Sequence, residues 1–356
     1  MTAVTHIDQF LAGFSAGDAI SNEALILQKF LRERGFQSEI FCEQFTDRDS
    51  ERVRHYKSYH QKRDAILIYH HSFFSGMVER LPGYPARKVL IFHNITPSQY
   101  VLPYNRGLAQ QLEKARNGLA KLASIFDVIL ADSRYNADEL RNLGFETEIL
   151  PVAIDFSVMD ESKDPAYLDF LRDGKTNVLF VGRIFPNKRH QDLIKTFYFF
   201  HRIRPASRLI CAGTFHPAVK GYTGELNNLT AELGLTEHVI FTGMAPQKDI
   251  TAYYRNSHIF LSMSGHEGFF VPILESMHFQ LPILALGSSV VPETMSGAGI
   301  IFNTADPLIV AELMEKTITD NDFRAKIIAG QNVRLKDYSV DKILSIFSTI
   351  IDRMLV

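Results

Sequence analysis

The chain has 356 residues, of which 46% are hydrophobic and 22% charged, and its formal net charge at pH 7 is −2. This length suits two domains, and this composition is that of a folded enzyme, which excludes wholesale disorder. The near-neutral charge provides no basic field for a nucleic-acid partner. The two cysteines, Cys42 and Cys211, lie in apolar runs, which indicates buried thiols in a reducing compartment.

No segment predicts export or membrane insertion. Residues 1–17 lack the basic stretch and long apolar run of a secretory signal, and no apolar span is long enough to cross a bilayer. We therefore expect a cytoplasmic protein. A basic stretch interleaved with aromatic residues indicates either a peripheral contact with the inner face of the membrane or a solvated basic helix face. Its members are Arg52, Arg54, Lys57, Lys62 and Arg63.

Short apolar runs alternate with amphipathic helical stretches along the chain, which is typical of parallel α/β sheets. In the first half we predict strands at 4–10, 38–42, 65–69, 88–92, 128–131 and 148–151. Helices are predicted over 20–34, ended by Gly35, and within 108–123.

In the second half we predict strands at 177–181, 207–212, 239–241, 259–262 and 283–286. The polar stretch 159–176 is the predicted linker, and residues 340–356 form an amphipathic helix. Two α/β domains joined by a linker predict a ligand cleft between them.

In the first half, polar candidates follow the predicted strands. Gly13 and Gly17 flank the turn after the first strand, without the spacing of a dinucleotide site or a P-loop. His93 follows strand 88–92 and can donate to a sugar hydroxyl or phosphate, or simply cap the turn. His70 and His71 follow strand 65–69 and could line an acceptor site.

The strand predicted at 177–181 leads into a basic loop. Gly182 ends the strand, and Arg183 and Lys188 follow it, at the edge where α/β sheets bind ligands. Arg183 offers a planar fork for phosphate, and Lys188 adds a compact charge. Solvated loop cations are the alternative. The position after a buried strand and the space cleared by Gly182 favour a phosphate site.

Two carboxylates, Glu267 and Glu275, flank the start of a helix that Pro272 is expected to open. The side chain of Glu275 leans back towards the region that Glu267 lines. The backbone N–H groups from Phe269 to Val271 lie close to both acids, and such a helix start is a ready anion site. The pattern predicts a ligand with a sugar at one end and phosphate at the other.

No metal site is expected. The Asp-x-Asp triplets at 47–49 and 320–322 lie in polar connecting segments without a preceding buried strand. No close Cys/His cluster has the spacing of zinc ligands. Asp132 and Ser133 follow strand 128–131, where they either face the cleft or cap a helix.

Together, the motifs at 182–188 and 267–275 resemble the retaining family 4 glycosyltransferases (glycosyl transferases group 1) of bacterial cell-surface polysaccharide synthesis. Agreement extends to 241–243 and to 291–299. The resemblance implies an α/β protein of GT-B fold, two Rossmann-like domains facing across a deep cleft. Residues 1–160 would bind the acceptor and 161–339 the nucleotide-sugar donor. The helix at 340–356 would pack back on the first domain.

The resemblance also implies roles for individual residues. Arg183 and Lys188 would grip the donor diphosphate, and Glu275 would hydrogen-bond the ribose. Glu267 and the amides after it would hold the transferred sugar, with His93 beside that sugar. The remaining donor contacts would come from backbone and apolar positions: Gly17, Gly182, Gly268, Phe269, Phe270 and Val271. The Gly13/Gly17 spacing departs from the adjacent glycine pair of many relatives.

The implied activity is retaining transfer of a hexose, with mannose from GDP-mannose as our first expectation and a UDP-sugar as the other donor. The acceptor would be a glycan or a lipid-linked glycan, and the reaction would need neither metal nor cofactor. Alternatives are a GT-B nucleotide-sugar epimerase, a phosphorylase, and a non-catalytic sugar-nucleotide-binding subunit of an assembly complex.

Overall fold

The computed structural model describes residues 4–62, 64–303 and 306–355, and the chain divides into two compact units. Unit 1 comprises Met1–Thr96, Gln110–Asp155 and Tyr338–Val356, and unit 2 comprises Pro97–Ala109 and Phe156–Asp337. The segment Pro97–Ala109 thus clusters with unit 2, although the sequence analysis includes it in the N-terminal domain. The predicted linker, 159–176, also lies in unit 2, because Leu168 and Leu171 are buried there.

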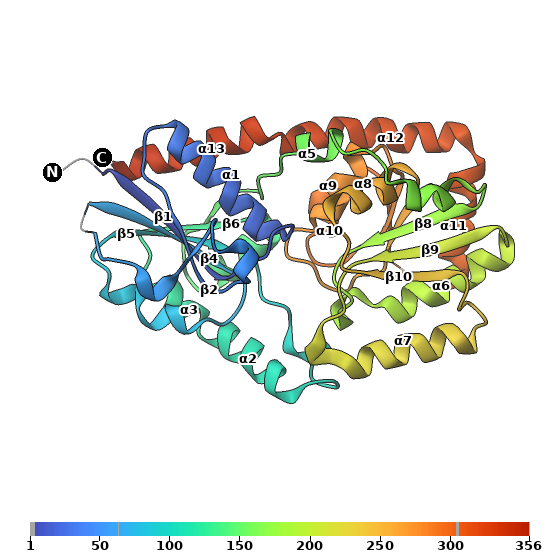
Figure 1. The fold of residues 1–356 in the computed structure, drawn as a ribbon, viewed down its shortest axis with the longest axis horizontal. Helices are drawn as coiled ribbons and strands as arrows, with labels where there is room; N and C mark the ends of the chain where they lie inside the picture. Colours follow the sequence, from blue (N-terminus) through green and yellow to red (C-terminus); the bar gives the residue numbers. More distant parts are fainter. Residues whose placement is uncertain (1–3, 63, 304–305, 356) are drawn as a thin grey trace. The chain divides into compact units, whose positions relative to one another are not determined.

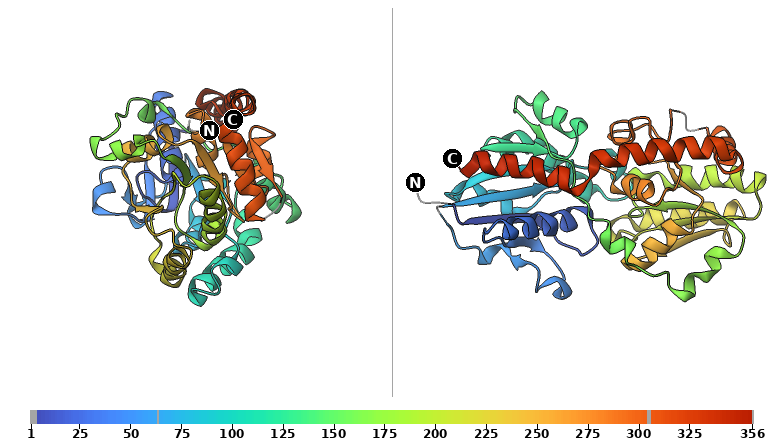
Figure 2. Two further views of the ribbon diagram at one scale, coloured as in Figure 1. Left: turned by 90° about the vertical axis from the view of Figure 1, so that its right-hand side faces the viewer. Right: turned by 90° about the horizontal axis from the view of Figure 1, so that it is seen from above.

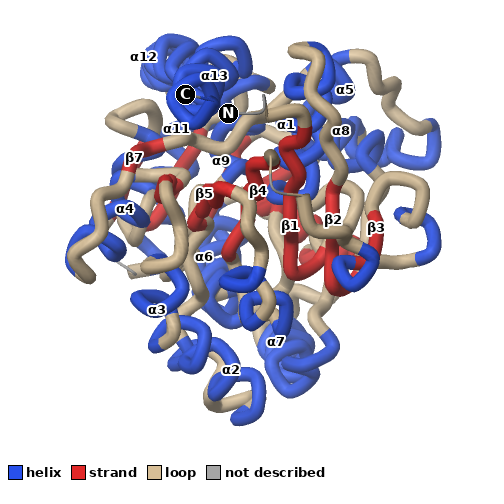
Figure 3. Tube along the Cα trace, turned by 90° about the vertical axis from the view of Figure 1, so that its left-hand side faces the viewer, coloured by secondary structure: helices blue, strands red, loops and turns tan. Residues whose placement is uncertain are grey.

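Unit 1 is built on a seven-stranded, all-parallel sheet with the strand order β3-β2-β1-β4-β5-β6-β7. The red strands in Figure 3 follow this order across the sheet. The strands are β1 (His6–Gly13), β2 (Ile40–Gln44), β3 (Arg54–His55), β4 (Ala65–His71), β5 (Arg87–Phe92), β6 (Val128–Ala131) and β7 (Glu148–Ile149).

Helices flank this sheet (Figure 1). They are α1 (Ala19–Glu33), α2 (Arg106–Asn117), α3 (Leu119–Ala123), α4 (Arg134–Asn142) and α13 (Val340–Leu355). The boundary between the units falls within α2, whose first residues cluster with unit 2. Residues 108–123 are therefore two helices rather than one, separated at Gly118, where an added Cβ would lie 3.2 Å from the Lys114 carbonyl.

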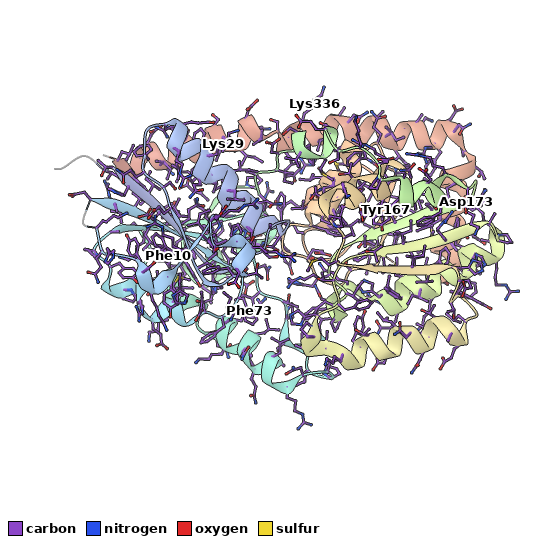
Figure 4. All side chains as sticks on the ribbon, viewed as in Figure 1. Phe10, Lys29, Phe73, Tyr167, Asp173 and Lys336 are labelled. Carbon is purple, nitrogen blue, oxygen red and sulfur yellow. The ribbon has the colours of Figure 1, made fainter. Side chains whose placement is uncertain are left out.

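The core of unit 1 joins the sheet to α1 and α13, which lie side by side (Figures 1 and 2). Phe347 of α13 is fully buried and packs against Phe30 of α1, with ring centroids 6.1 Å apart. Arg34, directly after α1, pairs with Asp352 at 2.6 Å. Figure 4 labels Phe10, buried on β1, and Lys29, on the exposed side of α1. The apolar stripe of α13 therefore stabilises unit 1 by burial.

Unit 2 contains a second parallel sheet, six-stranded, with the order β10-β9-β8-β11-β12-β13. Its strands are β8 (Thr176–Val181), β9 (Ser207–Ala212), β10 (Val239–Gly243), β11 (Ile259–Ser262), β12 (Ile283–Leu286) and β13 (Ile300–Phe302). Its helices are α5 (Ser157–Asp160), α6 (His190–Ile203), α7 (Lys220–Glu232), α8 (Gln247–Arg255), α9 (Val271–His278), α10 (Val291–Met295), α11 (Pro307–Thr319) and α12 (Asn321–Leu335).

The predicted α/β class with two parallel sheets is confirmed. Every strand predicted from the sequence is present. The two strands not predicted, β3 and β13, are two and three residues long and lie at sheet edges, where a short run carries little periodic signal.

Candidate functional site

In each sheet the chain reverses its direction of strand addition once, between β1 and β4 in unit 1 and between β8 and β11 in unit 2. Such switch points, at the carboxyl ends of the strands, are where open α/β sheets bind ligands. The loop after β8 contains Arg183 and Lys188, and the loop after β11 contains Glu267. Sheet topology therefore brings the two motifs of the second half to one edge of unit 2.

The centre of the unit 2 site is an ion pair between Lys188 and Glu267. The ammonium of Lys188 contacts Oε2 of Glu267 and lies 5.6 Å from the ring centroid of Phe270. The Lys188 side chain is 17% exposed and that of Glu267 is 5% exposed. Among the described residues, the other carboxylate oxygen of Glu267, Oε1, is buried without a hydrogen-bond partner. A buried acceptor of this kind is costly unless a ligand hydroxyl or amide reaches it.

Backbone bonds fix the two loops against each other. The side chain of Asn187 donates to the His266 carbonyl at 2.8 Å, and the Gly265 N–H donates back to the Asn187 carbonyl at 2.8 Å. The hydroxyl of Ser289 accepts from the Glu267 N–H at 2.8 Å. Three loops thus fix the backbone that carries Glu267, and neither Asn187 nor Ser289 was predicted to support it.

Helix α9 begins at Val271, so Pro272 is its second residue rather than its first. Its N-cap, Phe270, has a left-handed backbone with φ of 69° and offers no capping side chain. A left-handed backbone conformation is strained for a bulky residue, and such strained residues occur often at functional sites. Pro272 has no N–H and the Ile273 N–H donates to the Phe270 carbonyl at 3.0 Å, so within the described chain the Val271 N–H is the first-turn donor that a bound anion could use.

Glu275 lies in the second turn of α9 and accepts a hydrogen bond from the Tyr254 hydroxyl at 2.6 Å. Burial raises the pKa of Glu275 above its ordinary value, and the bond from Tyr254 offsets part of that rise. Tyr254 is fully buried on α8 and was not identified from the sequence. It orients the carboxylate that the sequence analysis associates with ribose.

Gly182 and Gly213 allow the ends of β8 and β9 to approach closely. Gly182 has a φ of 151°, and a Cβ on Gly213 would lie 2.0 Å from the Gly182 carbonyl oxygen. Arg183 is exposed and has no hydrogen-bond or ion-pair partner in the described parts of the chain, so its guanidinium is available. Gly213 was not predicted to belong to the site, although a glycine directly follows each of the two strands in the sequence.

In unit 1, the loop after β1 contains Gly17, which is exposed with a φ of 92° and open space where a Cβ would be. Its N–H donates to the Asn22 side chain at 3.3 Å. Asp18 caps α1 by accepting from the Ser21 N–H. The loop is a conventional strand-to-helix turn whose glycine leaves its backbone accessible.

His93 is buried at the edge of the unit 1 sheet, with both ring nitrogens directed at protein atoms. Nδ1 lies 3.3 Å from Oδ2 of Asp132, and Nε2 lies 3.1 Å from Nδ1 of His70. Burial lowers the pKa of His93, but the hydrogen bond to Asp132 and the charges of Glu23 and Asp132 outweigh it and raise that pKa. In this arrangement neither nitrogen is directed towards a ligand.

Glu23 of α1 completes this buried group, and no sequence motif identified it. Burial, together with the nearby Asp132, raises the pKa of Glu23 to about 7. Burial and the charge of His93 lower the pKa of His70 well below its ordinary value. His71 is equally buried, so neither His70 nor His71 presents its ring at the surface.

The remaining sequence candidates have local structural roles. Ser133 caps α4 by accepting from the Asn136 N–H at 3.1 Å, and Asp320 caps α12. Residues 47–49 form one turn of 3₁₀ helix. The basic stretch is not a helix face: Lys62 pairs with the buried Asp8 at 3.0 Å, and Arg63 lies outside the described residues. Its interleaved aromatic residues are buried.

No helix in the described chain combines the length and the apolar character needed to span a bilayer.

Residues 169–333 match the family described as glycosyl transferases group 1. The O-antigen chain mannosyltransferase B of Escherichia coli is 23% identical over 300 residues, which cover 81% of this chain and 76% of that protein. The serotype-specific mannosyltransferase WbdA of Escherichia coli is 31% identical over 121 residues, but these cover 32% of this chain and only 15% of WbdA.

Solved structures share the fold over nearly the whole chain. A sucrose-phosphate synthase from Thermosynechococcus elongatus superposes with a TM-score of 0.76 at 14% identity, covering 98% of this chain and 99% of that one. HepE of Anabaena in complex with UDP-glucose superposes with a TM-score of 0.75 at 15% identity, with the same coverage. These structures are GT-B glycosyltransferases. Residues 169–333 belong to the glycosyl transferases group 1, and together with the relatives and the paired parallel sheets they identify the chain as a hexosyltransferase with the GT-B fold.

Proposed function

We propose that the chain transfers a hexose from a nucleotide sugar to a glycan or lipid-linked acceptor, with retention of the anomeric configuration. The observation that carries this proposal is the Lys188–Glu267 pair beside the uncapped start of α9. It sets a cation, an unpartnered carboxylate oxygen and a helix start without a capping side chain at one sheet edge. A sugar diphosphate needs these three kinds of group.

Each residue then has a defined task. Arg183, Lys188 and the first amides of α9 receive the negative charge that develops on the departing diphosphate. Glu267 Oε1 accepts a hydroxyl of the transferred sugar, and Glu275, oriented by Tyr254, accepts the ribose hydroxyls. Gly17, Gly182 and residues 268–271 supply close backbone contacts. The charge balance at the diphosphate comes from Arg183 and Lys188, so this step is metal-independent.

Retention follows from same-face attack. The bond from the anomeric carbon to the phosphate oxygen breaks, the acceptor oxygen bonds to that carbon on the same face, and the acceptor proton passes to the leaving phosphate. This route needs no enzymatic nucleophile. The only carboxylate of the site that faces the sugar in our assignment, Glu267, is already paired with Lys188, which makes it a poor nucleophile.

Mannose is our first choice of sugar and GDP-mannose our first donor. The mannosyltransferase B and WbdA proteins, both similar to this chain, are named for mannose transfer and, in the first case, for the O-antigen chain. HepE has been solved with UDP-glucose, so a UDP-sugar is the competing donor. Cell-surface polysaccharide synthesis at the inner face of the membrane is the corresponding setting.

A donor screen followed by product analysis tests the proposal. GDP-mannose should raise the melting temperature more than UDP-, ADP- or dTDP-sugars, because only the matching base adds contacts. Transfer to a mannose-containing acceptor should give a product with the anomeric configuration of the donor, read by NMR. An inverted product contradicts retention. An epimerised donor, transfer to inorganic phosphate, or binding without turnover would instead identify an epimerase, a phosphorylase or a non-catalytic subunit.

A further inference from the structure

Three metal-ligating groups of unit 1 converge at the carboxyl ends of its central strands. They are the carboxylate of Glu23 on α1, the ring of His70 on β4 and the ring of His93 just after β5. Glu23 Oε2 lies 3.8 Å from His70 Nδ1 and 3.6 Å from His93 Nε2, and the two nitrogens are 3.1 Å apart. The side chains of Glu23 and His70 are fully buried, and that of His93 is 2% exposed.

The outward-facing nitrogens of the two rings have partners that fix their hydrogens. The Gln9 amide donates to the Ala24 carbonyl at 2.8 Å, so its oxygen is the atom that faces His70 Nε2 at 3.0 Å. Nε2 of His70 must therefore carry the hydrogen. Nδ1 of His93 faces the Asp132 carboxylate, which only accepts. In the neutral tautomers set by these partners, His70 Nδ1 and His93 Nε2 both present lone pairs.

The carboxylate of Glu23 also presents a lone pair. Its Oε1 accepts from the Ala153 N–H at 3.3 Å, whereas Oε2 is buried without a hydrogen-bond partner in the described residues. Three electron-rich atoms thus face one another with no hydrogen assigned between them. Protons can also occupy this cluster, one between the two rings and one on Glu23, and they are the alternative to a metal ion. A cation satisfies all three atoms together.

The dimensions of the triangle suit a small divalent ion. A point about 2 Å from all three atoms lies near its centre, and zinc binds histidine nitrogen and carboxylate oxygen at about 2.0–2.2 Å. Metal-bound histidines typically donate their other N–H to a carboxylate or an oxygen acceptor, as His93 does to Asp132 and His70 to Gln9. A dication also balances the buried carboxylates of Glu23 and Asp132.

We propose that Glu23, His70 and His93 form a zinc-type divalent metal site. The ion fastens α1 to β4 and to the end of β5, so its role is structural. The proposal does not involve Arg183 or Lys188, which receive the diphosphate charge in unit 2, but it makes a metal ligand of His93, which the resemblance places beside the transferred sugar. The sequence contains no sign of this site, since its ligands come from three separate elements and share no motif spacing.

Metal content and a spectroscopic probe test the site without reference to activity. We expect untagged full-length protein to contain about one equivalent of zinc per chain by elemental analysis. After removal of the metal by a chelator, added Co²⁺ should give the intense visible absorption of a four-coordinate site, and added Zn²⁺ should raise the melting temperature. Both responses should be lost in Glu23→Gln and in His70→Ala.

Two further variants separate ligation from misfolding. Asp132→Asn keeps all three ligands but weakens the partner of His93, and should reduce Zn²⁺ affinity about 10- to 100-fold. His278→Ala removes a histidine that pairs with Asp160 at 2.7 Å in unit 2, and should leave the stoichiometry at one. Three outcomes overturn the proposal: no Co²⁺ spectrum in wild-type protein, equal metal binding by Glu23→Gln, or a ¹⁵N spectrum showing His93 Nε2 protonated despite added Zn²⁺.

Discussion

The two polar centres of this enzyme solve the problem of buried charge differently. In unit 2, the carboxylate of Glu267 is neutralised by Lys188, whose side chain remains 17% exposed. In unit 1, the carboxylates of Glu23 and Asp132 are nearly sealed, and their neighbours are histidines. A permanent cation at a partly open edge leaves room for a ligand to exchange. The buried carboxylates of the unit 1 cluster instead need a proton or a metal ion that remains bound while the protein is folded.

This difference predicts how each centre responds to mutation. Residues of the unit 2 centre should affect turnover and donor binding more strongly than folding, because the Lys188 side chain is partly exposed and water can replace part of what is removed. Residues of the unit 1 centre should affect stability, because their removal leaves buried groups unpaired.

The largest expected effect is the loss of turnover in a variant of Lys188, the cation of the unit 2 centre. Lys188→Ala removes the cation that receives the leaving-group charge, so kcat should fall about 100- to 1,000-fold. The melting temperature should fall by only a few degrees, because Glu267 loses its cation but water can enter the partly exposed space that Lys188 leaves. The matched control is Lys195→Ala, an exposed lysine on α6. Wild-type turnover in Lys188→Ala would remove this residue from the proposed mechanism.

The next largest effect concerns the backbone on which the unit 2 site rests. Gly213→Ala places a methyl group 2.0 Å from the Gly182 carbonyl oxygen, so the strand ends must separate, at a cost of about 3 kcal/mol in unfolding free energy. Denaturant unfolding measures this loss. In Gly224→Ala, on α7, the added Cβ meets no atom within 4 Å, and the variant should be slightly more stable. Equal stability of the two variants would show that the strand ends tolerate separation.

A third test addresses the sealed centre. Asn136 donates to Asp132 and accepts from the Asn94 side chain at 2.5 Å. Asn136→Ala removes the partner of Asp132 Oδ1 and of the Asn94 side-chain nitrogen, both buried, which should cost about 2 kcal/mol of unfolding free energy. The donor KM should not change. Asn142→Ala, at the exposed end of α4, is the control, and a changed KM in Asn136→Ala alone would mean that the network extends to the donor.

The smallest expected effect concerns Glu275, whose substitution should change both the donor KM and the pH dependence of stability. Glu275→Gln weakens the ribose contact of our assignment, so the donor KM should rise about tenfold while kcat changes less. Because burial raises the pKa of Glu275 above 4.5, wild-type stability should decline as pH rises from 4.5 through that pKa. Glutamine does not titrate, so the variant should gain melting temperature relative to the wild type over that interval. Glu232→Gln on α7, which is exposed, should show neither effect.

Patterns local in the sequence predicted local structure well. A buried strand followed by Gly182 and Arg183, and two acids around a helix start, are contiguous signals, so the loops of the unit 2 site were identified before the fold was known. The boundary of α9 was displaced by one residue because Phe270 adopts a left-handed backbone, which its residue type does not predict.

Contacts between distant segments could not be predicted. Tyr254 reaches Glu275 only because α8 and α9 pack together, and Glu23 meets the two histidines only through the β1/β4 switch point. The cluster of Glu23, His70 and His93 has no zinc-ligand spacing in the sequence, because its members come from three separate elements. The basic stretch does not form a helix face, because its interleaved aromatic residues pack inward and Lys62 pairs with buried Asp8, and its contact with a membrane stays a prediction.

The membership of α13 in unit 1 has a consequence for the order of folding during synthesis. Unit 1 needs Phe347 to complete the core that packs against α1, yet α13 is synthesised after the whole of unit 2. The nascent chain therefore presents an unfinished apolar face on its first unit while the second is already able to close. Until α13 has been synthesised, that apolar face is exposed to solvent, so the chain can aggregate through it or be bound there by chaperones.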